Sequence, residues 1–77
     1  MVIAFVLIKV KRGGEVSVPE KIREMDGVID VAQLYGEYDV IAKVEKTNME
    51  ALQNFLVKEL RKVDGVDKTS TLITGKV

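Results

Sequence analysis

Apolar residues recur along this chain in two patterns, one typical of strands and one typical of helices. Residues 2–8 are a continuous apolar run rich in β-branched side chains. A run of this kind, too short for a helix, is typical of a strand covered on both faces. Helical spacing of apolar side chains, in contrast, predicts helices over residues 17–25 and 48–62. The remaining patterned segments predict three further strands, at residues 28–34, 38–45 and 69–74.

Each predicted helix begins with the same capping signal. Ser17 is followed three residues later by Glu20, and Thr47 is followed three residues later by Glu50. In such a capping box the hydroxyl accepts a hydrogen bond from a free N–H of the first turn, and the glutamate accepts one from the N–H of the cap residue. We therefore expect Ser17 and Thr47 to cap the two helices. The remaining acids of the first helix, such as Glu24, are interpreted together with Glu20 as solvating charges on an exposed face.

The two halves of the chain repeat each other at an offset of 38 residues. Residues 22–28 align with 60–66, and both segments end in Asp-Gly-Val, whose glycine stops the helix. Residues 3–8 align with 41–46 in the same way. Two strand–helix–strand units give the βαββαβ plan, and right-handed crossovers place the first and third strands in the centre. The sequence therefore predicts an α+β, ferredoxin-like sandwich: a four-stranded antiparallel sheet in the order 4-1-3-2, with two helices on one face.

The first strand is apolar on both of its faces. Successive side chains of a strand point to opposite sides, so Ile3, Phe5 and Leu7 share one face while the residues between them share the other. Two helices cover only one face of the sheet. An open apolar face would exceed the patch that a soluble monomer usually tolerates. We therefore expect at least a homodimer with its sheets packed face to face.

The centre of the chain carries a candidate binding turn, which we call the central turn: Tyr35-Gly36-Glu37-Tyr38-Asp39. Its glycine allows the chain to reverse between antiparallel strands. One interpretation is a plain hairpin that carries two tyrosines. The other is a small-molecule site in which Asp39 binds a ligand ammonium group.

Hydroxyl groups near the end of the chain complete the second interpretation. A ligand carboxylate needs N–H or hydroxyl donors, which the backbone around Gly36 and the side chains of Thr69 and Thr71 supply. Thr69 and Thr71 share a face, with Ser70 opposite. Strands two and four are opposite edges, so the central turn and these threonines would meet only across a subunit contact. The simpler interpretation is that the threonines are β-forming residues of an edge strand and that Asp39 is a turn acid.

Composition excludes several classes of function. The 77 residues suffice for one domain. Cysteine and histidine are absent, which removes thiol chemistry, the commonest metal ligand and the commonest general base. We therefore expect no enzyme activity, no metal and no cofactor. Basic and acidic residues balance at 12 each and are interspersed, unlike the basic surface of a nucleic-acid binder.

The hydropathy of the chain also predicts its location. It contains no stretch of about 18 apolar residues, so no membrane span is expected. The apolar opening is too short for a secretory signal and lacks a basic segment before it. We expect a cytoplasmic protein without a membrane partner.

Three features together resemble the ligand-binding domain of the Lrp/AsnC family of feast/famine transcription regulators, the domain called RAM. They are the apolar first strand, the Gly36-Glu37-Tyr38-Asp39 turn before an aliphatic strand, and the passage from Asp64-Gly65-Val66 to Thr69-Ser70-Thr71. The combination of the turn with this last passage is the most specific element. The resemblance extends over all 77 residues.

The resemblance implies a ferredoxin-like domain, dimers with facing sheets, and dimers joined into rings, commonly octamers. It also implies small effectors, typically amino acids, bound between dimers. Carried over to this sequence, the binding residues are Gly36, Tyr38, Asp39, Thr69 and Thr71. Tyr35 stands where the family often has threonine, and we include it in the predicted site.

Full-length family members carry a helix-turn-helix domain before this one, whereas this chain begins at the first strand. We therefore expect a single effector-binding and oligomerisation domain over residues 1–77 that does not itself bind DNA and that has full-length regulators as further partners. The predicted function is amino-acid sensing linked to oligomerisation. The alternatives are an ACT-like regulatory subunit of a metabolic enzyme and a pure oligomer scaffold. A small α+β-barrel enzyme is disfavoured because no convergent acid–base pair is present.

Overall fold

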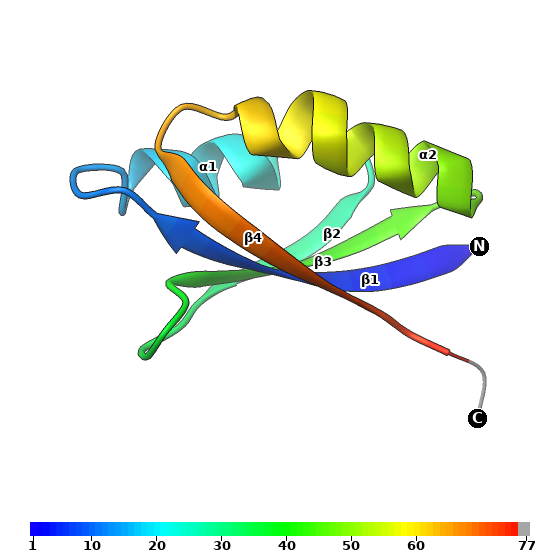
Figure 1. Cartoon of the computed structure of the whole chain (residues 1–77), viewed down its shortest axis with the longest axis horizontal. Coiled ribbons are helices and arrows are strands. Elements are labelled where there is room, and N and C mark those ends of the chain that lie inside the picture. Colours follow the sequence, from blue (N-terminus) through cyan, green and yellow to red (C-terminus); the bar gives the residue numbers. More distant parts are fainter. Residues whose placement is uncertain (76–77) are drawn as a thin grey trace.

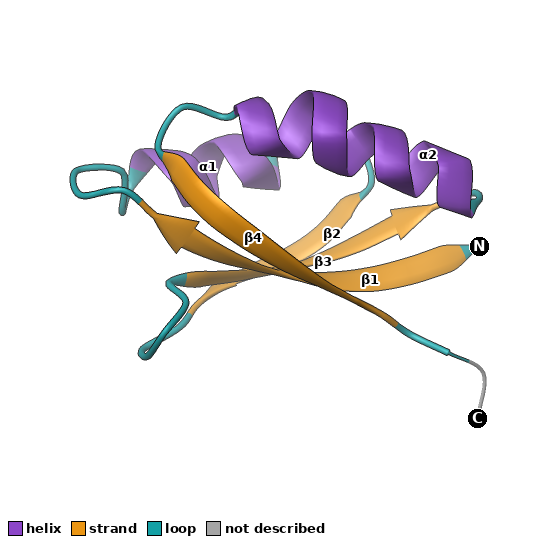
Figure 2. Ribbon diagram, viewed as in Figure 1, coloured by secondary structure: helices purple, strands orange, loops and turns teal. Residues whose placement is uncertain are grey.

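Four antiparallel strands form one twisted sheet, and the helices cover one of its faces (Figures 1 and 2). The structure is a computed structural model that describes residues 1–75. Its strand order is β2-β3-β1-β4, which confirms the predicted order and the α+β, ferredoxin-like class. The elements are β1 (Val2–Val10), α1 (Ser17–Arg23), β2 (Val28–Gln33), β3 (Val40–Lys46), α2 (Met49–Asn54) and β4 (Val66–Ile73).

The second helical segment does not keep one pitch. After α2, a π-helical turn follows over Phe55–Glu59 and a 3-10 turn over Leu60–Lys62. Helical structure therefore covers residues 49–62 of the predicted range 48–62. In Figure 1 these turns continue the ribbon labelled α2. None of the helices described within residues 1–75 is long and apolar enough to cross a membrane.

The core lies between the helices and one face of the sheet. From β1 it takes Ala4, Val6 and Ile8, all of them fully buried. The facing positions of β3 are buried as well, and so are the inward positions of both helices. These further core residues are Val40, Ala42, Val44, Ile22, Leu52, Phe55 and Leu60.

The other face of the sheet is also apolar at its centre. Ile3, Phe5 and Leu7 of β1 are half-buried there although no helix covers them. Phe5 lies opposite Lys43 of β3 and opposite Leu72 of β4, which is 57% exposed. The predicted second apolar face is therefore present.

The predicted cap of the first helix was wrong. Val16 precedes α1 with helical dihedral angles, and no side chain caps the helix. The loop before α1 is already turned, because the N–H of Val18 donates to the carbonyl oxygen of Gly14 at 3.0 Å. Ser17 consequently lies inside the helical geometry instead of at its boundary.

The second cap was misplaced by one residue. Asn48, in an extended conformation, is the cap, and its Oδ1 accepts a hydrogen bond of 2.8 Å from the N–H of Ala51. Asparagine caps a helix as well as threonine does, because its side-chain oxygen reaches the same free N–H groups. Thr47 therefore lies one residue outside the helix.

Three other boundaries of helices and strands differ from the predicted ones by a few residues. The first helix ends at Arg23, and Gly27 turns the chain into β2 with a φ of 89°. Strand β3 begins at Val40 because Tyr38 and Asp39 belong to the central turn. Strand β4 begins at Val66, three positions earlier than predicted, because it pairs with Val10 of β1 beyond a bulge.

The cap at Asn48 can be tested by substitution. Asn48→Ala should lower the free energy of unfolding by about 1 kcal/mol, since the N–H of Ala51 loses its partner. Thr47→Ala is the matched control and should change stability by less than half as much. Urea denaturation of both variants measures the difference. A larger loss of stability in Thr47→Ala than in Asn48→Ala would show that Thr47, the residue predicted from the sequence, is the cap.

Candidate functional site

The central turn joins β2 to β3 at one end of the sheet. The N–H of Leu34 donates to the carbonyl oxygen of Asp39 at 2.8 Å and closes the turn. Gly36 has a φ of 153°, and a Cβ added to it would meet no atom within 4 Å. The backbone at Gly36 thus adopts a conformation that other residues rarely take, and it borders open space where a ligand can approach.

Asp39 connects the central turn to the end of β1. Its N–H donates to the carbonyl oxygen of Ile8 at 2.9 Å, and its Oδ2 accepts a hydrogen bond of 2.8 Å from the N–H of Val10. The last pair between β1 and β3 joins Ile8 to Val40, so the N–H of Val10 lies beyond the end of that ladder. The carboxylate of Asp39 supplies the acceptor that β3 no longer provides. Within residues 1–75, Oδ1 of Asp39 accepts no hydrogen bond, so it is free to bind a ligand.

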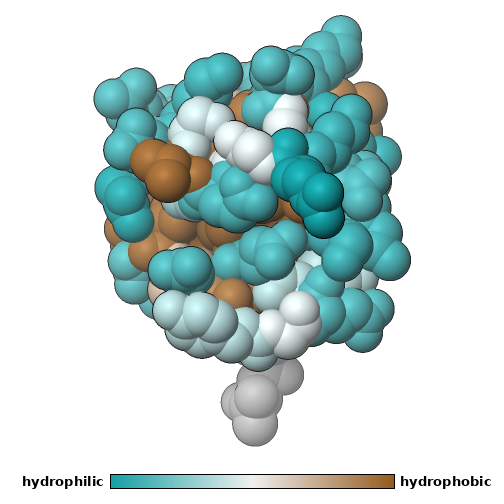
Figure 3. Space-filling view, turned by 90° about the vertical axis from the view of Figure 1, so that its left-hand side faces the viewer, coloured by the Kyte–Doolittle hydropathy of each residue, from teal (hydrophilic) through white to brown (hydrophobic). Residues whose placement is uncertain are grey.

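A hollow of about 440 Å³ lies between the central turn, β2 and α1. Figure 3 faces the end of the molecule that carries this turn, and hydrophobic surface is visible there between hydrophilic residues. Aliphatic residues of the sheet and of the chain beside it line the hollow, namely Val10, Val31, Leu34 and Val40. Its polar lining residues are Glu15, Glu20, Arg23, Gln33 and Asp39. An apolar floor with a few convergent polar groups is the usual composition of a small-molecule site.

Half of the predicted site residues border this hollow. Tyr35, Gly36 and Asp39 line it. Tyr35 is 91% exposed, so its ring stands at the rim and not inside the hollow. Tyr38 belongs to the same turn, but it faces β4, where Nζ of Lys68 lies 5.9 Å from the centre of its ring.

Thr69 and Thr71, the two predicted threonines of the site, do not line the hollow. Thr69 and Thr71 pair with Ile8 and Val6, so both point to the helix side of the sheet, while Ser70 pairs with Leu7 on the open side. This confirms that the two threonines share a face with Ser70 opposite.

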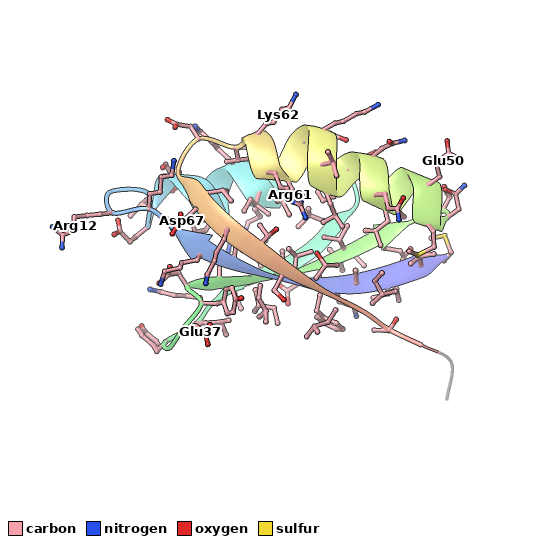
Figure 4. The ribbon with its side chains drawn as sticks, in the orientation of Figure 1. Arg12, Glu37, Glu50, Arg61, Lys62 and Asp67 are labelled. Carbon is pink, nitrogen blue, oxygen red and sulfur yellow. The ribbon has the colours of Figure 1, made fainter. Side chains whose placement is uncertain are left out.

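The surroundings of Thr69 are separate from the hollow. Thr69 lines a second, smaller pocket of about 290 Å³ together with Arg61, Asp67 and Lys68. Figure 4 shows Asp67 beside the upper part of β4, Arg61 below the second helical segment, and Glu37 at the tip of the central turn. Because β2 and β4 are opposite edges of the sheet, one chain does not bring the threonines to the hollow.

The sequence prediction missed several polar residues of the hollow. Glu15 accepts hydrogen bonds from the N–H of Gly13 at 2.9 and 3.2 Å, and a guanidinium nitrogen of Arg23 donates to the carbonyl oxygen of Val31 at 3.3 Å. Glu20, interpreted as a solvating charge, is exposed but also borders the hollow. Glu20 and Arg23 lie three positions apart in α1, a spacing that puts them on one helix face. This spacing is the feature of the sequence from which the pair could have been predicted.

The acidic residues around the hollow do not form a metal site. Within residues 1–75, no group of three or more His, Cys, Asp or Glu residues is arranged to hold a metal ion. The polar side chains that line the hollow can form hydrogen bonds and ion pairs with a ligand.

The fold of this chain is that of a ligand-binding domain found in transcription regulators. The chain matches the Lrp/AsnC ligand binding domain over residues 3–76, and it belongs to the Lrp/AsnC family. It is 37% identical over 76 residues to the HTH-type transcriptional regulator FL11 of Pyrococcus furiosus, an alignment that covers 99% of this chain and 50% of that protein. The chain spans about half the length of the curated relatives that it matches.

Solved structures show the same architecture. The crystal structure of FFRP-DM1 superimposes with a TM-score of 0.93 at 39% identity, covering 96% of this chain and 99% of that one. The structure of AsnC from E. coli gives a TM-score of 0.91 at 27% identity, covering 99% of this chain and 52% of that one. The fold therefore occurs both in a chain of similar length and within a longer regulator.

The contact between Asp39 and Val10 has a measurable consequence for stability. Asp39→Ala should lower the free energy of unfolding by about 1–3 kcal/mol, because the N–H of Val10 loses its acceptor in a partly buried place. Asp39→Asn keeps a side-chain oxygen for that bond and should retain most of the stability. Urea unfolding of the two variants distinguishes them. Equal stability of wild type and Asp39→Ala would show that the bond contributes nothing to the fold.

Proposed function

We propose that this protein is a non-enzymatic, amino-acid-sensing and oligomerisation module that acts with transcription regulators. The observation that carries the proposal is the central turn, in which Asp39 lies beside the open backbone of Gly36 at the rim of a hollow. This turn belongs to a domain of the Lrp/AsnC ligand-binding family, whose curated relatives are named as transcriptional regulators.

The ligand is bound through its charged ends. Asp39 takes the ammonium group through the carboxylate oxygen that the fold leaves free. Donors for the ligand carboxylate come from the backbone at Gly36 and from Thr69 and Thr71 of a neighbouring subunit. Tyr35 borders the ligand at the rim of the hollow, whereas Tyr38 of the same turn faces Lys68 of β4.

A related fold supports the choice of an amino acid as the ligand class. The transcriptional regulator NMB0573 of Neisseria meningitidis was solved as a complex with L-Met. It superimposes on this chain with a TM-score of 0.85 at 21% identity, covering 97% of this chain and 50% of that one, so the likeness is one of fold.

The open face of the sheet supports oligomerisation. A shallow hollow of about 90 Å³ lies on that face, and a partner side chain can insert into it. The hollow is lined by Phe5, Asp30, Ala32, Ile41 and Lys43. If two copies pack with these faces together, each copy covers the open apolar face of the other copy's β1. Such dimers then join into a ring, and a ligand bound between dimers shifts the population of assemblies to the extent that its affinity differs between them.

Native mass spectrometry with each of the twenty amino acids tests the sensing function. We expect assemblies with even numbers of subunits that gain ligand mass in proportion to the subunits. Asp39→Asn should keep the assemblies and lose the ligand, because an amide does not neutralise the ammonium charge. An even oligomer that binds no amino acid would contradict sensing and identify a scaffold, and a bare monomer would contradict the oligomerisation as well.

A charge on the open face tests the dimer contact. Leu7→Glu should weaken dimerisation by at least about 100-fold, since each dimer would bury two unpaired carboxylates. Val57→Glu is the matched control, because Val57 is 52% exposed on the second helical segment and away from that face. Sedimentation velocity measures both variants. If Leu7→Glu dimerises as tightly as Val57→Glu, the sheets do not face each other.

A further inference from the structure

The basic segment over residues 9–12 plays no part in the proposed function. Lys9, Lys11 and Arg12 give it three cations in four positions. Lys9 already has a partner, because its Nζ donates to the carbonyl oxygen of Glu37 at 3.4 Å. Acidic and basic residues balance at 12 each over the whole chain, so this segment is a local excess of positive charge. Such an excess on an exposed segment favours contact with an acidic surface.

A fixed turn holds Arg12 away from the body of its own chain. The N–H of Gly14 donates to the carbonyl oxygen of Lys11 at 2.9 Å, and Gly13 has a φ of 96°. This is the arrangement of a β-turn whose third residue has positive φ. The carboxylate of Glu15 braces the turn, since it accepts hydrogen bonds from the N–H of Gly13 at 2.9 and 3.2 Å. Arg12 is exposed at the tip, and Figure 4 shows it pointing outward from the end of the molecule.

The hollow beside this turn carries the opposite charge. The carboxylates of Glu15, Glu20 and Asp39 line it, together with the single guanidinium of Arg23. Glu15 and Glu20 are exposed, whereas Asp39 is half-buried and bonded to β1. The aliphatic floor of the hollow suits the methylene stem of an arginine, whose charged head remains at the polar rim. The hollow therefore fits a guanidinium on a flexible stem, with Glu15 and Glu20 as its counter-ions.

Exposed apolar side chains at the rim of the hollow indicate that its occupant is a protein. Tyr35 and Val16 line the hollow, yet they are 91% and 72% exposed. A small ligand inside the hollow leaves both of them in water, whereas a second protein surface covers them. Aromatic residues and arginine are enriched at the centres of protein interfaces. The ring of Tyr35 can also stack on a guanidinium.

The basic turn and the acidic hollow lie at the same end of the chain. Residues 11–14 connect Val10 to Glu15, and both of these residues line the hollow. In Figure 4, Arg12 and Glu37 of the central turn mark this end. A two-fold axis there brings the turn of each copy to the hollow of the other, so the same contact forms twice. The charge pattern is thus self-complementary, and the partner that it selects is a second copy of this chain.

We propose that two copies of this chain meet end to end, with Arg12 of each copy inserted into the hollow of the other and paired with Glu15 and Glu20. The inference rests on the proposed function where that function joins dimers, because it assigns the residues of the contact between them. The open face of β1 is used by the other contact. Each chain then carries two different two-fold contacts, and together these build an assembly larger than a dimer.

Salt concentration distinguishes the two contacts in the intact protein. Raising sodium chloride from about 0.1 M to about 1 M shortens the screening length from about 10 Å to about 3 Å. The end-to-end contact depends on charge, so sedimentation velocity should show assemblies larger than the dimer at low salt and dimers at high salt. The apolar contact between the sheets should persist, since hydrophobic burial is not screened.

Reversal of one charge locates the end-to-end contact. Arg12→Glu should weaken the joining of dimers by at least about 100-fold at low salt, since like charges then meet at two places. The dimers themselves should remain. Arg61→Glu is the matched control and should assemble as the wild type does, because Arg61 is also exposed but lines the other pocket. Urea unfolding of Arg12→Glu should match that of the wild type, because Arg12 stands at an exposed turn.

A mixture of two variants tests the pairing itself. Glu20→Arg alone should also weaken the joining of dimers, because the introduced arginine repels Arg12 of the neighbour. In an equal mixture of Arg12→Glu and Glu20→Arg, the introduced glutamate of one variant pairs with the introduced arginine of the other. Arg12 of the second variant enters the unchanged hollow of the first. The mixture should therefore regain the larger assemblies that each variant lacks alone.

The possible outcomes separate this inference from the proposed function. If Arg12→Glu assembles as the wild type does, or if the mixture does not regain the larger assemblies, the inference is overturned. If the wild type is only a dimer at about 0.1 M salt, the inference and the proposed ring both fail. Amino-acid binding and the contact between sheets are then still decided by native mass spectrometry and by Leu7→Glu. A wild type that is a monomer contradicts the proposed oligomerisation together with the inference.

Discussion

The structure depends on a central strand that is apolar on both faces. One face of β1 supplies fully buried residues to the core beneath the helices, and the other carries Ile3, Phe5 and Leu7. With such a strand at its centre, a domain this small gains burial on the helix side and leaves an apolar patch on the other side. Stability and the proposed association therefore depend on the same strand, and a change on its open face is expected to act on assembly more than on the fold of one chain.

Asp39 links the candidate site to this central strand. Its backbone and its carboxylate both bond to the end of β1, at Ile8 and at Val10, so the central turn is tied to the middle of the sheet. A ligand ammonium bound to the same carboxylate would share it with the N–H of Val10. The site is thereby connected to the strand whose open face is the proposed dimer contact. This connection gives a short physical path between an effector and the assembly.

The internal repeat explains the fold, and its departures from symmetry explain the site. The first strands of the two halves, β1 and β3, lie antiparallel side by side in the centre, as the repeat requires. The connections into the helices differ, because the loop before α1 is long and the one before α2 passes quickly to the cap at Asn48. The longer loop supplies Glu15 and Val16 to the hollow. The proposed binding site thus lies where the two halves diverge.

The sequence alone determined the strand order, the two faces of β1 and the position of the central turn. These follow from periodicity and from the repeat, both of which can be read along the chain without any tertiary contact. It did not determine the helix caps, since Ser17, Thr47 and Asn48 are all competent cap residues and the choice depends on how the preceding loop turns. Only the tertiary structure decided which charges surround the hollow, because Arg23 meets β2 and Asp39 meets Val10 through packing between elements distant in the chain. No local pattern encodes such contacts.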